Sequence, residues 1–405
     1  MKLILHDFSG HPFQAELSRK LAAVGHQVEH VSCDQYVSGK GHLEVQPDDS
    51  PTLSFTGNMI DLPFQKYAPL GRLRFELAYG KAWIQQLKLA QTDVVIACNL
   101  PLISMYRFAR YAKRARLPYV MWHQDIYSAG LADELRRRLP RPFASLGARV
   151  FERMEAFCAR NASHVVAIGE AFRDVYPGWK VAPANVSVIP NWAPLDKVRP
   201  ADRANRRSAD LFDDAVTLRL VYAGTLGRKH NPELLVDVLQ GVLDLDVSAA
   251  MAVISEGEGA DDLKALARSR NVPLRVLPFQ PAEDLPDVLG SADVLVALLE
   301  PDATKFSIPS KVLSYMAAGR PILGLMPADN PAAVDIVESG GFVADPTEVG
   351  AKGASAWLAK LSSDPTLIAG IGEQTRAQAE RKFDVDKVAD DFGVILARAV
   401  SASRD

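Results

Sequence analysis

Residues 2–33, KLILHDFSGHPFQAELSRKLAAVGHQVEHVSC, hold two apolar runs with a helical pattern between them. Lys2–His6 is a predicted strand because it is short and largely apolar, and Gln27–Cys33 is predicted as the next strand. The segment between them carries apolar residues at helical spacing and stops at Gly25, which is typical of a helix end. Apolar strands that are separated by helices predict a parallel sheet covered on both faces.

The same alternation continues along both halves of the chain. In the first half, further buried strands are predicted at Asp93–Cys98, Tyr119–His123, His164–Ile168 and Val186–Ile189. In the second half, strands are predicted at Leu218–Ala223, Ala250–Ser255, Leu274–Pro278, Asp293–Leu298 and Pro321–Leu325. The predicted fold class is therefore α/β, with a doubly wound, Rossmann-like sheet built twice.

The length of 405 residues exceeds what one ordinary core fills, and it predicts two domains. Between the two sets of strands, Asn191–Asp214 is polar and rich in Arg and Asp, as expected of a linker. We predict a first domain over 1–195, a second over 196–382, and a terminal helix over 383–405 that folds back on the first domain. Two such domains facing each other across a cleft would bind ligands at the carboxyl ends of their strands.

Composition narrows the class of protein. The net charge of −3 argues against a general nucleic-acid-binding protein. The three cysteines, Cys33, Cys98 and Cys158, lie in apolar stretches and predict reduced thiols in a cytoplasmic protein. The N-terminal apolar run is too short for a signal peptide, and no stretch has the ~20 apolar residues that span a bilayer.

One segment of the second half combines a helix start with a cation. Residues 307–311, SIPSK, precede an apolar helical pattern. The free amides of a helix N-terminus and a nearby lysine suit an anion. An ordinary capped helix with a surface lysine is the alternative. The candidate binding residues are Ser307, Pro309, Ser310 and Lys311.

A second segment runs from a predicted strand into a glycine loop with two cations. Residues 222–230 read YAGTLGRKH. A glycine here lets the backbone approach a ligand closely, and the cations could hold a diphosphate. A basic turn at a strand end is the alternative. The candidates are Gly224, Thr225, Arg228 and Lys229.

Together these two segments resemble the retaining glycosyltransferases of the GT4 family, especially the branch that builds bacterial surface polysaccharides. Three more segments match the family's pattern in the same order: VIPN at 188–191, ISEGEG at 254–259 and SADVLV at 291–296. The similarity covers roughly residues 1–345. Within ISEGEG, Glu256 and Gly257 are candidates for contact with the donor.

The resemblance implies the GT-B fold. It also implies transfer of a sugar, with retention of anomeric configuration, from a nucleotide diphosphate sugar to a hydroxyl on a glycan or a lipid-linked saccharide. The nucleotide sugar is a co-substrate, and no cofactor is expected. Many members carry two glutamates eight residues apart at the SIPSK helix, where this chain has Phe306 and Ser314. The second glutamate contacts the donor ribose, so the donor base and sugar stay open, as do the acceptor and the oligomeric state.

The candidate chemistry of the first domain lies in WHQDIY at 122–127, which resembles the family's segment beside the reacting sugar. Asp125 and His123 share a face if the strand continues, whereas only one reaches the cleft if the chain turns at Gln124. We favour Asp125 as the catalytic group that orients the acceptor hydroxyl. His123 is the alternative, although a hydrogen-bonded structural role also fits it, and Gln124 is placed on the acceptor side.

Two further strand ends of the first domain supply candidates. Gly10 lies in the loop after the first strand, and in the family this loop covers the donor phosphates and the acceptor. A plain turn is the alternative. Asn99 follows the strand that ends at Cys98 and is a candidate on the acceptor side.

No catalytic metal is predicted. Asp244-Leu245-Asp246 resembles the Asp-x-Asp metal motif of the other major transferase fold, but it directly follows a predicted helix and favours a turn. No group of His or Cys residues has metal-ligand spacing. Cations and helix dipoles would then stabilise the leaving diphosphate.

Basic residues gather in the first domain, and the triplet Arg136–Arg138 follows a helical pattern with apolar residues on one face. Such a patch suits a peripheral contact with anionic lipid at the inner face of a membrane. A solvated basic face is the alternative.

Two other functions stay open on the sequence alone. A nucleotide-sugar 2-epimerase has a similar fold, but it would need several acidic and His residues around one sugar, and it would act on the donor without an acceptor. A non-catalytic GT-B protein that binds a glycan or a partner would explain the missing glutamates, but it would not explain the retained cations.

Overall fold

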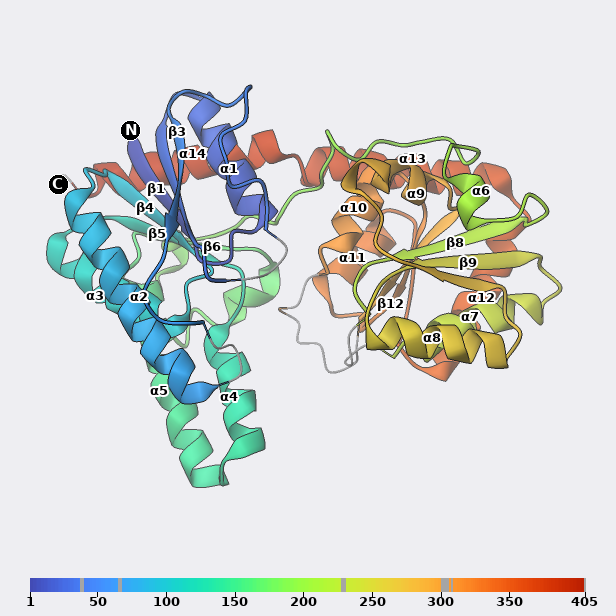
Figure 1. Ribbon diagram of the computed structural model, residues 1–405, viewed down its shortest axis with the longest axis horizontal. Coiled ribbons are helices and arrows are strands. Elements are labelled where there is room, and N and C mark those ends of the chain that lie inside the picture. Colours follow the sequence, from blue (N-terminus) through green and yellow to red (C-terminus); the bar gives the residue numbers. More distant parts are fainter. Residues whose placement is uncertain (37–39, 65–67, 227–230, 300–305, 307–308, 404–405) are drawn as a thin grey trace. The chain divides into compact units, whose positions relative to one another are not determined.

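The computed structural model describes residues 1–36, 40–64, 68–226, 231–299, 306 and 309–403 (Figure 1). The chain divides into two compact units, Met1–Asn191 with Val385–Asp405, and Trp192–Asp384. We call them unit 1 and unit 2. Each is built around one parallel sheet.

The described part of unit 1 contains a seven-stranded parallel sheet in the order β3-β2-β1-β4-β5-β6-β7. Its strands are β1 (Lys2–Asp7), β2 (Gln27–Cys33), β3 (Leu53–Asn58), β4 (Val94–Cys98), β5 (Tyr119–His123), β6 (His164–Ala167) and β7 (Val186–Val188). Its α-helices are α1 (Pro12–Ala23), α2 (Pro69–Leu89), α3 (Leu102–Ala115), α4 (Tyr127–Arg138), α5 (Arg141–Asn161) and α14 (Val385–Ser401). The strand order reverses between β1 and β4, which makes their carboxyl ends the switch point where such sheets bind ligands.

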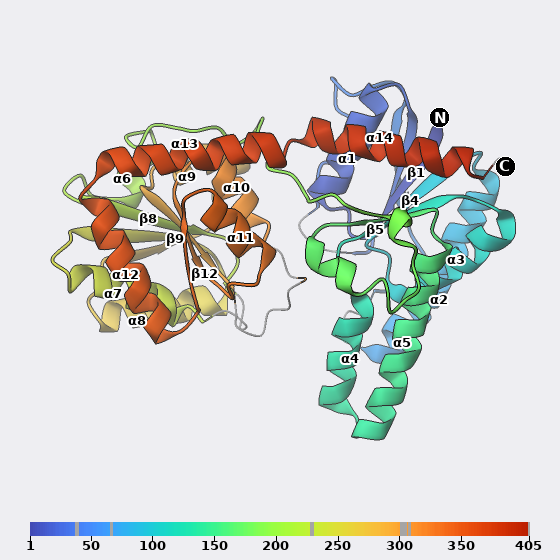
Figure 2. The same ribbon diagram turned by 180° about the vertical axis from the view of Figure 1, so that it is seen from behind.

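The last helix, α14, completes unit 1. It packs on α1 and on strands β4 and β5 (Figure 2). The buried ring of Phe392 meets Trp122 of β5 with ring centroids 5.0 Å apart. The sheet is thereby covered on this face, which is why β4 and β5 can be buried along their whole length.

The described part of unit 2 contains a six-stranded parallel sheet in the order β10-β9-β8-β11-β12-β13. Its strands are β8 (Leu218–Ala223), β9 (Ala249–Ile254), β10 (Leu274–Leu277), β11 (Val294–Leu298), β12 (Ile322–Leu325) and β13 (Phe342–Ala344). Its α-helices are α6 (Ser208–Leu211), α7 (Glu233–Leu243), α8 (Glu258–Ser269), α9 (Leu285–Gly290), α10 (Lys311–Ala318), α11 (Pro331–Glu338), α12 (Glu348–Ser362) and α13 (Pro365–Lys382). The switch point of this sheet lies between β8 and β11.

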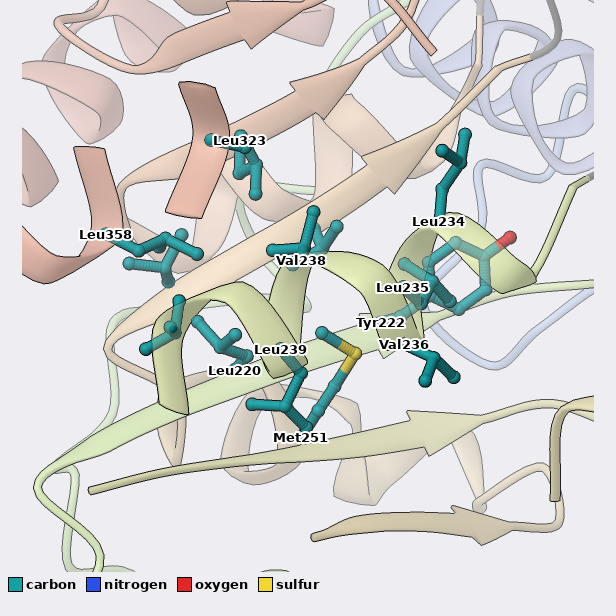
Figure 3. Close-up of a cluster of buried hydrophobic side chains, with 14 of the residues drawn as sticks. Leu220, Tyr222, Leu234, Leu235, Val236, Val238, Leu239, Met251, Leu323 and Leu358 are labelled. Atoms are coloured by element: carbon teal, nitrogen blue, oxygen red, sulfur yellow. The ribbon is translucent and has the colours of Figure 1, made fainter. Parts of the chain in front are cut away.

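The core of unit 2 forms where α7 and α12 cover one face of the sheet (Figure 3). Leu220 and Met251 project from neighbouring strands toward Leu235 and Leu239 of α7, and Leu358 of α12 closes the cluster. All five side chains are almost completely buried. Burying one such side chain contributes roughly 1.5–3 kcal/mol, so this layer anchors β8, the strand that leads to Gly224.

The predicted fold class, two doubly wound Rossmann-like units, is confirmed. Two edge strands, β3 and β13, were missing from the prediction. Only the end residues of β3, Leu53 and Asn58, are buried, so its sequence lacks a continuous apolar run. No helix in the described ranges is long and apolar enough to cross a bilayer.

The polar stretch predicted as a linker is part of unit 2 from Trp192 onward. Its charges make ion pairs within that unit. Arg203 pairs with Asp293 at 2.7 Å, and Arg206 pairs with Asp284 at 2.6 Å. The predicted linker therefore packs on unit 2 through ion pairs, and a search for apolar patterns does not detect such packing.

Candidate functional site

A buried carboxylate and an amide join the two strands at the switch point of unit 1. Asp7 at the end of β1 is fully buried, and its Oδ1 accepts a hydrogen bond from Asn99 Nδ2, after β4, at 2.8 Å. Its Oδ2 accepts the backbone amide of His11 at 2.6 Å. Burial raises the pKa of Asp7, and the Asn99 hydrogen bond opposes that rise. Asn99 has a φ of 51°, a left-handed backbone conformation that few residues other than glycine adopt. The hydrogen bond to Asp7 holds Asn99 in this conformation.

The loop after β1 needs a glycine at Gly10. Its φ is 69°, and its carbonyl accepts the amide of Gly41 at 2.8 Å. A Cβ added at this position would lie 2.7 Å from the side chain of Leu43. Gly10 therefore lets a second loop lie directly on the switch point.

His123, the last residue of β5, is held on both sides. Its side chain is buried, with Nδ1 3.1 Å from the Tyr176 hydroxyl and Nε2 3.1 Å from Glu155 Oε1. Both ring nitrogens are therefore engaged. The strand ends at His123, so His123 and Asp125 do not share a face of a continuing strand.

Glu155 also caps helix α4. This fully buried carboxylate accepts the backbone amides of Tyr127 at 2.9 Å and Ser128 at 2.8 Å, at the first turn of that helix. A negative charge at a helix N-terminus complements the helix dipole. One side chain from α5 thus fixes both the ring of His123 and the start of α4.

The two residues after His123 differ in their contacts. Gln124 and Asn191 form a reciprocal pair of side-chain amide hydrogen bonds, each 3.0 Å. Asp125 is solvent-exposed, and partial loss of water to the surrounding protein raises its pKa. The nearby charges of His123 and His11 lower that pKa, and Glu155 raises it. A carboxylate with a raised pKa at the carboxyl edge of a parallel sheet suits proton transfer or orientation of a hydroxyl.

Three of the predicted first-domain residues meet around one small pocket. The residues that line it include Asn99, His123 and Gln124, together with Tyr127 and Glu155. The pocket lies at the carboxyl ends of β4 and β5, beside the switch point. Asn99 follows β4, whereas His123 and Gln124 lie at the end of β5, and the pairing of these two strands brings the residues together.

In unit 2, Gly224 and Lys311 meet at the switch point. A Cβ added at Gly224, whose φ is 147°, would lie 2.9 Å from Lys311 Cε. The Lys311 ammonium lies 3.9 Å from the centre of the Tyr222 ring and donates to the Tyr222 hydroxyl. Burial lowers the pKa of Lys311 to about 8. The partly dehydrated ammonium group of Lys311 therefore lies directly against the backbone of Gly224.

Two tyrosines hold the end of β8 and the first residues after it. The Tyr315 hydroxyl, on α10, donates to the carbonyl of Ala223 at 3.1 Å and accepts its amide at 2.8 Å. The Tyr222 hydroxyl donates to the carbonyl of Thr225 at 3.0 Å. Helix α10, which begins after Pro309 and Ser310, is thereby tied to the strand end that carries Gly224.

The loop after β9 lies against the same segment. Ser255 Oγ accepts the amide of Leu226 at 3.1 Å, and a Cβ at Gly259 would lie 2.5 Å from the Leu226 carbonyl. Gly257 has a φ of 98°, and a Cβ there would meet no atom of the described structure within 4 Å. Glu256 Oε1 accepts the amide of Phe279 at 3.0 Å. Glu256 therefore fixes the loop after β10, while Gly257 leaves open space at the start of α8.

Comparison with known proteins assigns the family. The family model of the glycosyl transferase 4-like domain matches residues 11–192, and that of glycosyl transferases group 1 matches residues 217–361. The chain belongs to the GT4-type glycosyltransferases. The resemblance predicted from the sequence is thus confirmed for the family.

A curated relative of this glycosyltransferase is the probable glycosyltransferase WbjE of Pseudomonas aeruginosa, at 24% identity over 237 residues. The match spans 58% of this chain and 57% of that protein's length. Sucrose-phosphate synthase of Thermosynechococcus elongatus superposes with a TM-score of 0.72 at 15% identity, over 99% of this chain and 100% of that one. HepE of Anabaena, solved in complex with UDP-glucose, has a TM-score of 0.66 at 17% identity, over 98% and 99%. These structures show the shared GT-B fold.

Three of the predicted donor residues of this glycosyltransferase, Arg228, Lys229 and Ser307, lie outside the described residues. Two residues of the site were not predicted. Asp7 follows an apolar run and precedes a glycine loop, a local signal that could have identified it. Glu155 lies within an amphipathic helix, and no local signal distinguishes it from a surface carboxylate.

The part of the chain that the structure describes offers no metal site. No group of three His, Cys, Asp or Glu side chains in it could hold a metal ion. Asp244 follows α7, and Asp246 has a φ of 57° with its amide bonded to the Leu243 carbonyl at 2.9 Å. This pair therefore lies in a turn. The metal-independent reaction stays a prediction.

Proposed function

We propose that this protein transfers a sugar from a nucleoside diphosphate sugar to an acceptor hydroxyl. The contact between Gly224 and Lys311 at the switch point of unit 2 carries the proposal. In the described ranges no carboxylate pairs with Lys311, and its pKa is lowered because of burial alone. A diphosphate would supply the missing negative charge. The absent side chain at Gly224 lets Lys311 lie directly against the end of β8.

The proposed donor is a uridine diphosphate sugar. The support is the fold shared with HepE, which was solved with UDP and with UDP-glucose. The chain has Ser314 where the family has a ribose-binding glutamate, so the hexose and the strength of nucleotide binding need direct measurement. During transfer, Lys311 would stabilise the charge that develops on the leaving diphosphate.

Unit 1 is proposed to supply the acceptor-side group. Of the two candidates, Asp125 is solvent-exposed. His123 is buried, and both of its ring nitrogens are engaged by Tyr176 and Glu155. We assign Asp125 the orientation of the acceptor hydroxyl and His123 the role of a positioning residue. Asn99 and Gln124, which line the small pocket beside His123, would bind the acceptor.

We further propose that configuration is retained and that the acceptor is a glycan or a lipid-linked saccharide of a bacterial surface polysaccharide, made at the cytoplasmic face of a membrane. The support for this branch is the fold that the chain shares with WaaG, a glycosyltransferase involved in lipopolysaccharide biosynthesis.

The test begins with a panel of nucleoside diphosphates and their sugars in thermal unfolding. A ligand present at 100 times its Kd adds about 2.7 kcal/mol to the free energy of unfolding. Turnover is then measured with the best donor and saccharide acceptors, and the product anomer is assigned by NMR. Stabilisation by UDP and formation of an α-linked product from an α-linked donor would support the proposal. Conversion of the donor without an acceptor would instead show an epimerase, and binding without any turnover would show a non-catalytic protein.

A further inference from the structure

Helices α4 and α5 form a hairpin that extends away from the sheet of unit 1 (Figure 1, Figure 2). The two helices pack closely along their length. At Gly147 of α5 an added Cβ would lie 2.6 Å from Leu135 of α4, so the small residue permits the close approach. The tip of the hairpin, which we define as residues 136–150, takes no part in the proposed donor or acceptor contacts.

Four large apolar side chains of this tip are exposed. The exposed fractions are 44% for Leu139, 65% for Phe143, 62% for Leu146 and 46% for Val150. The last three recur at intervals of three and four residues along α5, so they share one face of that helix. Scattered apolar residues are normal on a surface, but a continuous stripe indicates a contact surface.

The same tip is strongly basic. Residues 136–150 contain five arginines and no Asp or Glu, in a chain whose net charge is −3. Arg136 and Arg138 pair with carboxylates of α4. Within the described ranges no carboxylate pairs with Arg137, Arg141 or Arg149. The tip therefore carries both an apolar stripe and uncompensated positive charge.

We propose that the α4–α5 tip is a docking surface for an anionic phospholipid bilayer. The apolar side chains would enter the interface between headgroups and acyl chains, while the guanidinium groups contact lipid phosphates. A negatively charged membrane surface complements this charge, whereas two copies of the same basic tip repel each other. A neutral apolar partner would leave the arginines uncompensated.

Docking would also fix the distance between the membrane and the candidate site. Helix α4 begins beside Glu155 and Asp125 and has 12 residues, so its length is about 18 Å. The base of the hairpin would lie no farther than about this length from the lipid surface. This consequence for the acceptor rests on the proposed function, whereas lipid binding itself does not.

The test is co-sedimentation of the full chain with vesicles. One set is phosphatidylcholine alone, and the other mixes phosphatidylcholine with phosphatidylglycerol. We expect binding to the mixed vesicles that weakens as salt is raised, and little binding to the neutral ones. UDP binding is measured by calorimetry without vesicles on the same preparations, so a failure of lipid binding is separate from a failure of donor binding.

Two sets of variants locate the surface. Each basic side chain contributes roughly a fivefold factor to binding at an anionic surface, so Arg137→Glu/Arg141→Glu/Arg149→Glu should weaken binding by roughly a hundredfold or more. Phe143→Ser/Leu146→Ser should weaken it at least tenfold at constant charge. The matched controls in unit 2 are Lys264→Glu/Arg268→Glu/Lys352→Glu and Val334→Ser/Val349→Ser, all at exposed positions.

Three results would overturn the proposal. The first is a wild-type chain that stays in the supernatant with both kinds of vesicle. The second is hairpin variants that bind as the unit 2 controls do. The third is a wild-type dimer in light scattering that Phe143→Ser/Leu146→Ser dissociates, because the stripe would then join two copies of the chain.

Discussion

Lys311 at the start of α10 lies over the ring of Tyr222 at the end of β8, with its Nζ 3.9 Å from the ring centre. The two residues are 89 positions apart in the sequence. The ring face attracts the ammonium group but does not replace its hydration, and burial lowers the pKa of Lys311 to about 8. The folded unit 2 therefore holds a cation whose charge an anion would stabilise.

Lys311→Ala should weaken the binding of UDP without unfolding the protein. A charge-assisted hydrogen bond contributes roughly 1.5–3 kcal/mol, which corresponds to a loss of affinity on the order of tenfold or more. Calorimetry measures the affinity, and thermal unfolding checks the fold. Lys352→Ala, an exposed lysine of α12, is the matched control. Equal UDP affinity in Lys311→Ala and the wild type would remove Lys311 from the donor site.

The affinity for UDP should fall as the pH rises through about 8. The free protein loses the Lys311 proton near that pH, whereas a bound diphosphate holds the proton to higher pH. The contribution of Lys311 to the affinity is therefore constant below about pH 8 and decreases above it, with proton uptake on binding. Lys311→Arg keeps its charge throughout and should remove this dependence. A wild type and an arginine variant with the same pH profile would contradict the assignment.

The parallel sheets were predictable from sequence because their inner strands are buried on both faces and appear as unbroken apolar runs. The contact of Gly224 with Lys311 was partly predictable, since a glycine loop and a helix start are local signals. Asp7 and Glu155 were missed because each acts through a distant partner. Asp7 bonds to Asn99 across 92 residues, and Glu155 bonds to His123 across 32. Such pairings depend on strand order, which local patterns do not determine.

Glu155→Gln should destabilise the protein by about 1–3 kcal/mol. The buried carboxylate accepts two backbone amides at the start of α4 and contacts His123, and an amide cannot satisfy all three with its single oxygen. Chemical denaturation measures the loss. Glu152→Gln, one turn earlier on α5 and exposed, is the control and should change stability little. Equal stability of both variants would show that α4 does not depend on this cap.

Sugar transfer should continue in the presence of EDTA. The described residues contain no cluster suited to a metal ion, and cations such as Lys311 would stabilise the leaving diphosphate. Rates are compared with and without chelator after extensive dialysis. A complete loss that magnesium or manganese restores would show that a metal site exists and that the acidic turn at Asp244 needs to be examined again.

Asp125→Asn should abolish most sugar transfer and leave UDP affinity nearly unchanged. Asparagine keeps the shape of the side chain but loses the charge that would orient or deprotonate a hydroxyl, a contribution of roughly a hundredfold or more.

His123→Asn should behave differently, because both nitrogens of the buried His123 ring are bonded to Tyr176 and Glu155. Losing these contacts should lower the free energy of unfolding by roughly 1–3 kcal/mol while folded enzyme keeps measurable turnover. Turnover, UDP affinity and stability are therefore measured on both variants. A stable, inactive His123→Asn beside an active Asp125→Asn would exchange the two roles. Normal turnover in both would move the acceptor-side chemistry away from the end of β5.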